Sequence, residues 1–246
     1  MSLHQHSFLA INVGGKVAGL IERLGPSGEQ SGPISAQEEY AQAVLFAASE
    51  FVATVDQMKY AVRSLAGFRR VEARGSRFEP TRLDHLIYHL ENHIIRTVTL
   101  IDRSLQLTNI VYGLGIPERG CSETTVAENA HLKSSAAAKE LRRLLALVKP
   151  LRQQRNVIVH RRRYRDDTMR RIGTFFVLEQ IEQGDEPAKR VTPNYRWLYK
   201  ALTDKYVAEK KRELAESNAQ AEEICAALFT ALEVEFDRQW QSRSVS

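Results

Sequence analysis

Residues 35–65 read SAQEEYAQAVLFAASEFVATVDQMKYAVRSL, and their pattern decides the fold class. Ser35 with Glu38 three positions later matches a capping box, which signals the start of a helix. Apolar side chains then recur at alternating intervals of four and three residues, which places them on one face of a helix. A stripe of this length needs a partner helix to cover it, so we predict a long helix in a bundle. The stripe consists of Val44, Ala48, Phe51, Val55, Met58, Val62 and Leu65.

A second helical stripe begins at Thr81, with Asp84 three positions later, and ends at the loop of residues 113–117. The break at residues 67–80 separates the two helices, and both are long enough to pair antiparallel. The sequence therefore predicts an all-α fold, a helical bundle with two long antiparallel helices. The apolar positions of the second stripe are Leu83, Ile87, Leu90, Ile94, Ile101, Leu105 and Tyr112.

The rest of the chain is also mainly helical in this interpretation. A third helix lies within residues 125–149, and Pro150 begins a new helical turn, where its missing N–H needs no partner. Residues 172–181 are β-branched and aromatic enough for a strand, but we favour irregular or helical structure. Residues 194–246 contain no glycine or proline, which predicts one long helix, or two with a break near residues 217–218.

Composition suggests how the chain is organised. Residues 1–34 hold six of the 13 glycines, which predicts an irregular leader. We expect the bundle to span residues 35–165, and a mainly helical C-terminal extension, residues 166–246, to pack on it. The two cysteines, Cys121 and Cys225, are too few for a disulfide framework. No apolar run reaches the length of a membrane span and no secretory signal pattern is evident, so we expect a cytoplasmic protein with no membrane partner.

The positive charge of the chain is concentrated in one segment. The net charge is +5, and residues 152–171 hold eight arginines against two aspartates. A local positive field of this kind is what contact with a nucleic acid requires. An arginine-rich loop that is merely solvated by water is the alternative.

Within this basic segment, residues 155–164 read RNVIVHRRRY. Histidine exchanges a proton near neutral pH, so His160 can act as a base or an acid. Arginine presents a planar fork of donors that matches phosphate oxygens, which suits Arg155 to a phosphate. Together with Asn156 and the following arginines, these residues point to a phosphodiester, most simply RNA. The alternative is a capped helix in which Arg155 pairs with a carboxylate and His160 is a core residue.

The pattern Arg155-Asn156-x-x-x-His160 resembles the Arg-x(4–6)-His motif of the HEPN superfamily, in which a polar residue, often asparagine, follows the arginine. The two long antiparallel helices also fit, as does a motif near the start of a later helix, behind Pro150. The resemblance covers residues 35–165 and implies a HEPN-like helical bundle. Many HEPN proteins are metal-independent endoribonucleases of bacterial toxin–antitoxin, abortive-infection or other defence systems. They typically act as homodimers in which both motifs meet at a shared cleft.

The resemblance also implies a role for each residue of the motif. His160 would act as base on the ribose 2′-OH or as acid on the leaving 5′-oxygen, Arg155 would hold the scissile phosphate, and Asn156 would orient the pair or the substrate. No cofactor is implied, and the products would be a 2′,3′-cyclic phosphate and a 5′-OH. An antitoxin or another protein partner fits such a system, although Arg162 stands where some HEPN toxins carry a modifiable tyrosine. We expect the RNA contacts to come from Arg152, Arg161, Arg162, Arg163 and Arg165.

The second predicted helix carries a polar constellation. His85, His89 and His93 recur at intervals of four, and two histidines at this spacing can bind zinc. The outer two lie about 12 Å apart along a helix, so a single ion cannot take all three. No ligand from another helix is evident, so we predict a polar seam and no metal site. Nearby polar residues could support Arg155 or His160, or could form a solvated face: Glu91, His93, Arg96 and Asp102.

The sequence leaves two functional hypotheses open. The first is an endoribonuclease that cleaves RNA by 2′-OH attack. The second is a non-catalytic HEPN-like dimer that binds RNA or another protein. Cleavage of RNA in the presence of a metal chelator separates the two, because only the first predicts a cyclic-phosphate product.

Overall fold

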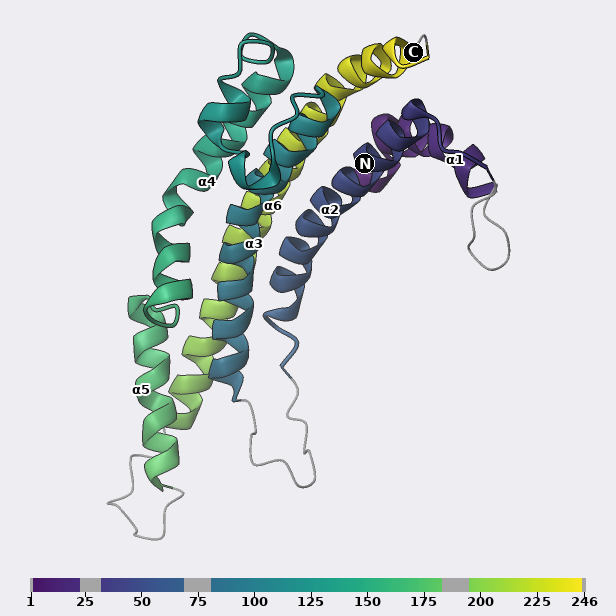
Figure 1. Cartoon of the computed structure of the whole chain (residues 1–246). Helices are drawn as coiled ribbons and strands as arrows, with labels where there is room; N and C mark the ends of the chain where they lie inside the picture. The colour runs from purple at the N-terminus through teal and green to yellow at the C-terminus, as the bar shows by residue number, and fades with distance from the viewer. Residues whose placement is uncertain (1, 23–31, 69–80, 183–194, 245–246) are drawn as a thin grey trace. The chain divides into compact units, whose positions relative to one another are not determined.

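The computed structural model describes residues 2–22, 32–68, 81–182 and 195–244. These residues contain helices and no β-strand, which confirms the all-α prediction (Figure 1). Short helical turns, η1 to η4, accompany the α-helices. The elements are η1 (Leu3–Gln5), η2 (Phe8–Val13), α1 (Gly14–Glu22), α2 (Ala36–Ser64), α3 (Arg82–Val111), η3 (Glu118–Gly120), η4 (Glu123–Ala127), α4 (Ala136–His160), α5 (Asp167–Glu182) and α6 (Tyr195–Ser242).

The chain divides into two compact units, and several helices contribute residues to both. Unit 1 comprises Met1–Asp56, Arg96–Leu151 and Ala219–Ser246. Unit 2 comprises Gln57–Ile95 and Arg152–Asn218.

Both predicted capping signals are present as hydrogen bonds. The Ser35 hydroxyl accepts from the backbone N–H of Glu38 at 3.3 Å, and the Glu38 carboxylate accepts from the N–H of Ser35 at 2.8 Å. Thr81 and Asp84 make the same reciprocal pair at the start of α3, at 3.1 and 3.2 Å. Each pair satisfies backbone donors that the first helical turn leaves free. All seven residues of the first predicted stripe are buried.

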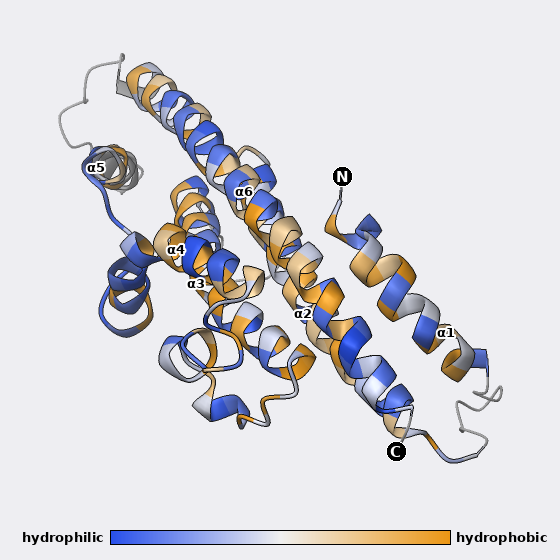
Figure 2. Cartoon of the chain, turned by 90° about the horizontal axis from the view of Figure 1, so that it is seen from above, coloured by the Kyte–Doolittle hydropathy of each residue, from blue (hydrophilic) through white to orange (hydrophobic). Residues whose placement is uncertain are grey.

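Helices α2 and α3 run antiparallel, as predicted. In unit 1, the Tyr40 hydroxyl near the start of α2 donates to the Val111 carbonyl at the end of α3, at 2.8 Å. In unit 2, a ring nitrogen of His85 near the start of α3 lies 2.7 Å from the Ser64 carbonyl at the end of α2. Figure 2 shows hydrophobic and hydrophilic residues side by side along both helices, as expected for helices with one buried face.

The prediction of an irregular segment over residues 1–34 differs from the structure, because Leu3–Gln5 and Phe8–Glu22 are helical, while residues 23–31 lie outside the described residues. Phe8 and Val13 are fully buried, and Phe8 packs against Phe229 and Phe236 of α6, with ring centroids 5.2 and 5.8 Å apart. Lys16 pairs with Asp237 of α6 at 2.7 Å. The glycines misled the prediction because tertiary contacts outweigh a helix propensity deficit of about 1 kcal/mol per glycine.

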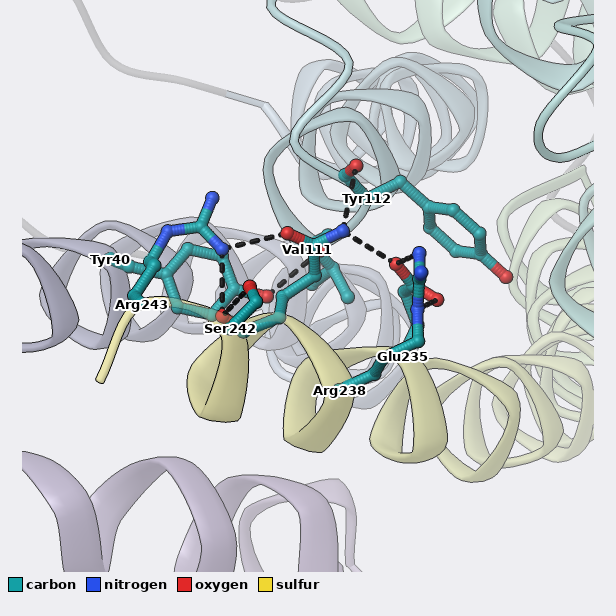
Figure 3. Close-up of polar contacts among 8 residues, drawn as sticks. Tyr40, Val111, Tyr112, Glu235, Arg238, Ser242 and Arg243 are labelled. Atoms are coloured by element: carbon teal, nitrogen blue, oxygen red, sulfur yellow. Dashed lines mark hydrogen bonds and ion pairs between the residues drawn. The ribbon is translucent and has the colours of Figure 1, made fainter. Parts of the chain in front are cut away.

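A polar cluster joins the ends of α2, α3 and α6 in unit 1 (Figure 3). The Arg243 guanidinium lies over the Tyr40 ring, 4.2 Å from its centroid, and donates to the backbone carbonyl of Gln239 at 2.8 Å. Gln239 in turn donates to the Tyr112 carbonyl at 3.5 Å. Burial raises the pKa of Tyr40, so its hydroxyl stays protonated and keeps donating to Val111.

The core of unit 2 draws on α3, α5, α6, the residue that follows α2, and the connection between α4 and α5. Its members share low exposure and apolar surface, and Tyr164 of the connection is one of them. Figure 1 shows α5 beside the parts of α3 and α6 that belong to this unit. The buried residues are Leu65, Leu86, Ile87, Leu90, Ile94, Tyr164, Met169, Ile172, Tyr206 and Val207.

Helix α4 is continuous through Pro150, so the prediction of a new helix beginning there is wrong. A proline lacks the N–H that would bond to the carbonyl four residues earlier, and in a helix interior it costs about 3 kcal/mol. The helix continues because residues on both sides of the proline are held by packing. Leu144 and Val148 are buried in unit 1, and Ile158 packs against the core of unit 2.

The two segments with open secondary-structure alternatives are both helical. Residues 172–181 lie within α5, so neither the strand nor the irregular alternative holds. Helix α6 runs unbroken through residues 217–218. Asn218 is 5% exposed, and its side-chain oxygen lies 2.8 Å from a ring nitrogen of His93. The polar residue that suggested a break is therefore a buried hydrogen-bond partner.

Candidate functional site

The Arg155-to-His160 segment forms the last six residues of α4. The expectation that it lies near the start of a later helix is therefore wrong, because Pro150 does not begin one. The Val157 carbonyl accepts hydrogen bonds from the backbone N–H groups of Arg161 and Arg162, at 2.9 and 3.0 Å. These bonds close the helix, and the following residues leave it as a non-helical connection to α5.

Arg155 and Asn156 are brought into direct contact. A terminal nitrogen of the Arg155 guanidinium donates to the Asn156 side-chain oxygen at 3.1 Å. The Arg155 Nε–H is buried and has no hydrogen-bond partner among the described residues. A buried donor of this kind is costly to leave unmatched, so an oxygen acceptor supplied from outside the chain would satisfy it.

His160 is exposed in the last turn of α4. Its ring makes no hydrogen bond or ion pair within the part of the chain that the structure describes. Asn156 lies one helical turn before it, whereas Arg155 is rotated from it by about 140° around the helix axis. The structure thus joins Arg155 to Asn156 and leaves His160 accessible, so the alternative of His160 as a core residue is wrong.

The connection between α4 and α5 carries most of the predicted RNA-contacting arginines. Arg161, Arg162, Arg163 and Arg165 are exposed, and Arg152, within α4, is half-buried. Arg163 is fixed by an ion pair with Asp84 of α3, with nitrogen and oxygen 2.9 Å apart.

Asp84 is held in its charged form at this contact. Partial burial works against the charge, but hydrogen bonds from Thr81 and Arg163 outweigh it and lower the pKa of Asp84. The carboxylate that caps α3 therefore also orients one arginine of the connection.

Tyr164 anchors the connection in the core of unit 2. Its backbone N–H donates to the Glu91 carboxylate at 2.7 Å, and its hydroxyl donates to Asp166 at 3.0 Å. The Tyr206 hydroxyl donates to the same Asp166 oxygen at 2.8 Å, and the other oxygen accepts from the Met169 N–H at 2.7 Å. Asp166 is thus the N-cap of α5 and the acceptor for two buried hydroxyls. Burial raises the pKa of both tyrosines, which keeps these hydroxyls protonated as donors.

The sequence interpretation missed Tyr164, Asp166 and Tyr206 as positioning residues. One available signal was an aspartate directly before a helical pattern, which is a preferred N-cap. The contacts of Tyr164 with Glu91 and of Tyr206 with Asp166 had no such signal, because these partners are 73 and 40 residues apart in the chain. Because hydrogen bonds hold Tyr164 and Asp166 in place, the arginines of the connection project from a backbone of fixed position.

The four residues considered as a supporting network fall in different units. Glu91 bonds to the backbone of Tyr164, so it supports the arginine connection rather than Arg155 or His160. His93 is 1% exposed and contacts Asn218, so it cannot touch a substrate. Arg96 and Asp102 belong to unit 1, and their proposed role remains a prediction.

Two of the three histidines of α3 pack ring against ring. His85 and His89 lie with ring centroids 4.4 Å apart, and Tyr88 packs edge-on against His89 at 5.1 Å. Burial lowers the pKa of His89 and of His93. In the described ranges, no group of three histidine, cysteine or acidic side chains is arranged to hold a metal ion. His85 also contacts the Ser64 carbonyl, and His93 contacts Asn218.

None of the described helices combines enough length with enough apolar character to cross a bilayer. The longest, α6, is polar over much of its length.

Comparison with known proteins identifies the family. No curated protein and no solved structure gives a match. A family model described as HEPN_Cthe2314-like HEPN matches residues 39–208. The match covers most of the chain and extends past residue 165, where we expected the bundle to end. It includes α3, α4 and α5 completely, with the Arg155-to-His160 segment inside it. The chain therefore belongs to the HEPN superfamily, in its Cthe2314-like family.

Proposed function

We propose that the protein is a metal-independent endoribonuclease whose site lies at the end of α4. The observation that carries the proposal is the Arg155 and Asn156 pair, with its unmatched buried Nε–H, one turn before the accessible His160. A cation with a free donor, beside a proton-exchanging ring, suits a phosphodiester. We place this activity in a bacterial toxin, abortive-infection or defence setting, in which an antitoxin or another protein can be the partner.

The reaction follows from the two side chains. His160 takes the proton of a ribose 2′-OH, and the freed oxygen attacks the adjacent phosphorus. The bond from phosphorus to the 5′-oxygen breaks, and that oxygen receives a proton from an imidazolium. The products are a 2′,3′-cyclic phosphate and a 5′-OH. Arg155 binds the non-bridging phosphate oxygens and stabilises their charge in the transition state.

A homodimer is part of this proposal. Attack and departure occur on opposite sides of the phosphorus, and one imidazole cannot be base on one side and acid on the other at the same moment. The motif of a single chain contains one histidine. A second copy of the chain would supply the second imidazole and a second Arg155 at a shared cleft.

The test is RNA cleavage by purified protein in EDTA, compared between wild type and His160→Ala. General acid–base catalysis contributes about 10²- to 10⁴-fold, so His160→Ala should lose at least that factor. His131→Ala is the matched control, because His131 is exposed and lies outside the motif. Product ends are read by mass spectrometry, where a cyclic phosphate is expected. Equal cleavage by wild type and His160→Ala would overturn the catalytic assignment.

A non-catalytic RNA-binding dimer is the second candidate. It is favoured by the His160 ring, which no hydrogen bond orients within the described ranges, because catalytic histidines are usually held by a partner group. In this case no cyclic phosphate forms, and RNA affinity falls steeply with salt as bound counterions are released. Replacing Arg161, Arg162 and Arg163 by alanine would then weaken binding and reduce its salt dependence.

A further inference from the structure

A groove opens in unit 1, beside the second half of α3. It has a volume of about 450 Å³ and is lined by residues of α2, of α3 and of the segment 116–121, which follows α3. This volume is in the range of small-molecule sites, about 300–1,000 Å³. All of its lining residues belong to unit 1, whereas the Arg155-to-His160 segment belongs to unit 2. The groove therefore shares no residue with the proposed nuclease site.

The floor of the groove is apolar and open. Ala43 and Ala47 lie one helical turn apart on α2, and their short side chains leave space above the helix. Phe46 also lines the groove and is 62% exposed, so its ring is a large apolar surface in contact with water. Ile110 and Ile116 complete the apolar lining. A ligand that covers these side chains gains free energy in proportion to the apolar area that it removes from water.

The loop that lines the groove is fixed in position. The Asn109 side chain donates to the Ile116 carbonyl at 2.8 Å and accepts from the Ile116 N–H at 3.1 Å. The Cys121 thiol donates to the same carbonyl at 3.8 Å. These bonds tie the loop back to α3, so the groove is formed before any ligand binds. Sites for small molecules are usually preformed in this way.

The polar side chains of the groove carry an excess of negative charge. Arg103 is the one cation among the described lining residues, and it pairs with Glu50 at 3.2 Å and donates to Gln106 at 3.1 Å. Gln106 in turn donates to the Glu118 carboxylate at 3.1 Å. Glu118 is exposed and makes no ion pair within the ranges that the structure describes. Burial, and with it the charge of Glu118, raises the pKa of the Cys121 thiol, so this carboxylate acts on the groove itself.

We propose that this groove binds a small organic ammonium ion with an apolar body. An ammonium group is a compact cation with three donors, and it pairs with the carboxylate of Glu118. The apolar body covers the Phe46 ring and fills the space over the two alanines. A carboxylate or phosphate on the ligand would meet the excess negative charge of the groove. An uncharged ligand would leave Glu118 without a counter-charge.

The test measures binding of two probe ligands to the full chain by ligand-observed NMR, at fixed low salt and near neutral pH. One probe is 2-phenylethylammonium, and the other is 3-phenylpropionate, which has the same ring and spacer but a negative charge. Glu118→Gln removes the unpaired charge, and Ala47→Leu fills the floor. Glu216→Gln is the matched control, because Glu216 is an exposed glutamate of α6 outside the groove. Circular dichroism verifies the fold of each variant.

We expect wild type to bind the ammonium probe at least about threefold more tightly than the carboxylate probe, the effect of one exposed charge contact. Glu118→Gln should weaken ammonium binding by about two- to fivefold and bring the two affinities together. Ala47→Leu should weaken it by about tenfold or more, because the added side-chain atoms overlap with the ligand. Glu216→Gln should stay within about 1.5-fold of wild type for both probes, since salt screens a distant exposed charge.

Two results would overturn the proposal. In the first, wild type does not bind the ammonium probe more tightly than the carboxylate probe. In the second, a folded groove variant binds the ammonium probe as wild type does. If Ala47→Leu fails to fold, the two probes compared on Glu118→Gln decide, because Glu118 is exposed and its replacement leaves the core intact.

The groove and the nuclease are tested independently. Glu118 lies outside the Arg155-to-His160 segment and the arginine connection, so Glu118→Gln should cleave RNA as wild type does. His160→Ala should keep ammonium binding unchanged, because His160 does not line the groove. Weaker ammonium binding by the groove variants therefore supports the groove whether or not His160→Ala still cleaves RNA.

Discussion

Replacing Asp166 by alanine should release the arginine connection and the first turn of α5. One Asp166 oxygen caps the Met169 N–H at 2.7 Å, and the other accepts from the Tyr164 and Tyr206 hydroxyls at 3.0 and 2.8 Å. Both tyrosines are buried, at 7% and 4% exposure, so water cannot replace the lost acceptor without rearrangement.

The size of the effect follows from these contacts. Loss of an N-cap aspartate costs about 1 kcal/mol. The Tyr164 and Tyr206 hydroxyls can still bond to each other, so one buried hydroxyl is left without an acceptor, at about 1–3 kcal/mol. We therefore expect Asp166→Ala to destabilise α5 and its contacts by about 2–4 kcal/mol.

The assay is hydrogen exchange of the α5 backbone amides, because a chain of two units need not unfold in one step. The expected loss lowers amide protection by roughly thirtyfold to a thousandfold, at about 1.4 kcal/mol per tenfold. Under the proposed function, cleavage of RNA should fall in parallel, because Arg163 and Arg165 flank the released Tyr164.

Asp166→Asn and Tyr206→Phe are the matched controls. Asparagine caps a helix as well as aspartate and keeps a side-chain acceptor, so Asp166→Asn should cost less than about 1 kcal/mol. Tyr206→Phe removes one donor without orphaning the carboxylate, and should cost about 1 kcal/mol. If Asp166→Ala perturbs α5 no more than Asp166→Asn, the reasoning from the shared carboxylate is refuted.

Three further predictions concern stability. Burial lowers the pKa of His93, so the folded state keeps the ring neutral. The stabilisation of the folded state by the neutral ring is complete above pH about 6.5. It is lost as the pH falls below this value, at up to about 1.4 kcal/mol per pH unit. Thermal melts between pH 7 and 5 should show the decline. Pro150→Ala should stabilise α4 by about 1–3 kcal/mol, because the alanine N–H can bond to the Ala146 carbonyl; hydrogen exchange of the α4 backbone amides measures the gain. Phe236→Ala should cost about 3–5 kcal/mol, measured by hydrogen exchange of the α6 amides, since Phe236 is fully buried.

Two of these predictions have a control variant, and the third has an outcome that would contradict it. His93→Gln removes the titrating ring and should flatten the decline between pH 7 and 5; an unchanged decline would assign it to other groups. Val234→Ala, at a position 76% exposed on the same helix as Phe236, should stay within about 0.5 kcal/mol of wild type. A Pro150→Ala protein less stable than wild type would show that the proline shapes α4 in a way its packing requires.

The long helices were predictable because their signals are local. The capping pairs Ser35 with Glu38 and Thr81 with Asp84 lie three residues apart, and the stripes repeat within one turn. Such patterns depend only on the geometry of a single helix. The same locality explains the errors at Pro150 and in residues 1–34, where contacts made far along the chain outweighed local propensity.

The candidate site likewise contains residues that the sequence predicts and residues that only the structure identifies. The residue types at Arg155, Asn156 and His160, and the basic charge around them, could be read from the sequence because they concern chemistry within ten residues. The supports of the arginine connection could not, because Arg163 meets Asp84 across 79 residues and Tyr164 meets Glu91 across 73.

The sequence by itself determined the helical class, both helix starts of the antiparallel pair, and the residue types of the candidate motif. Only the tertiary structure decided that this motif ends α4 instead of opening a helix, and that Tyr164 is a buried anchor between exposed arginines. It also decided that Arg163 pairs with Asp84 of α3. The reason is physical: a helix is set by neighbours one turn away, whereas burial and ion pairing depend on which distant surfaces the folded chain brings together.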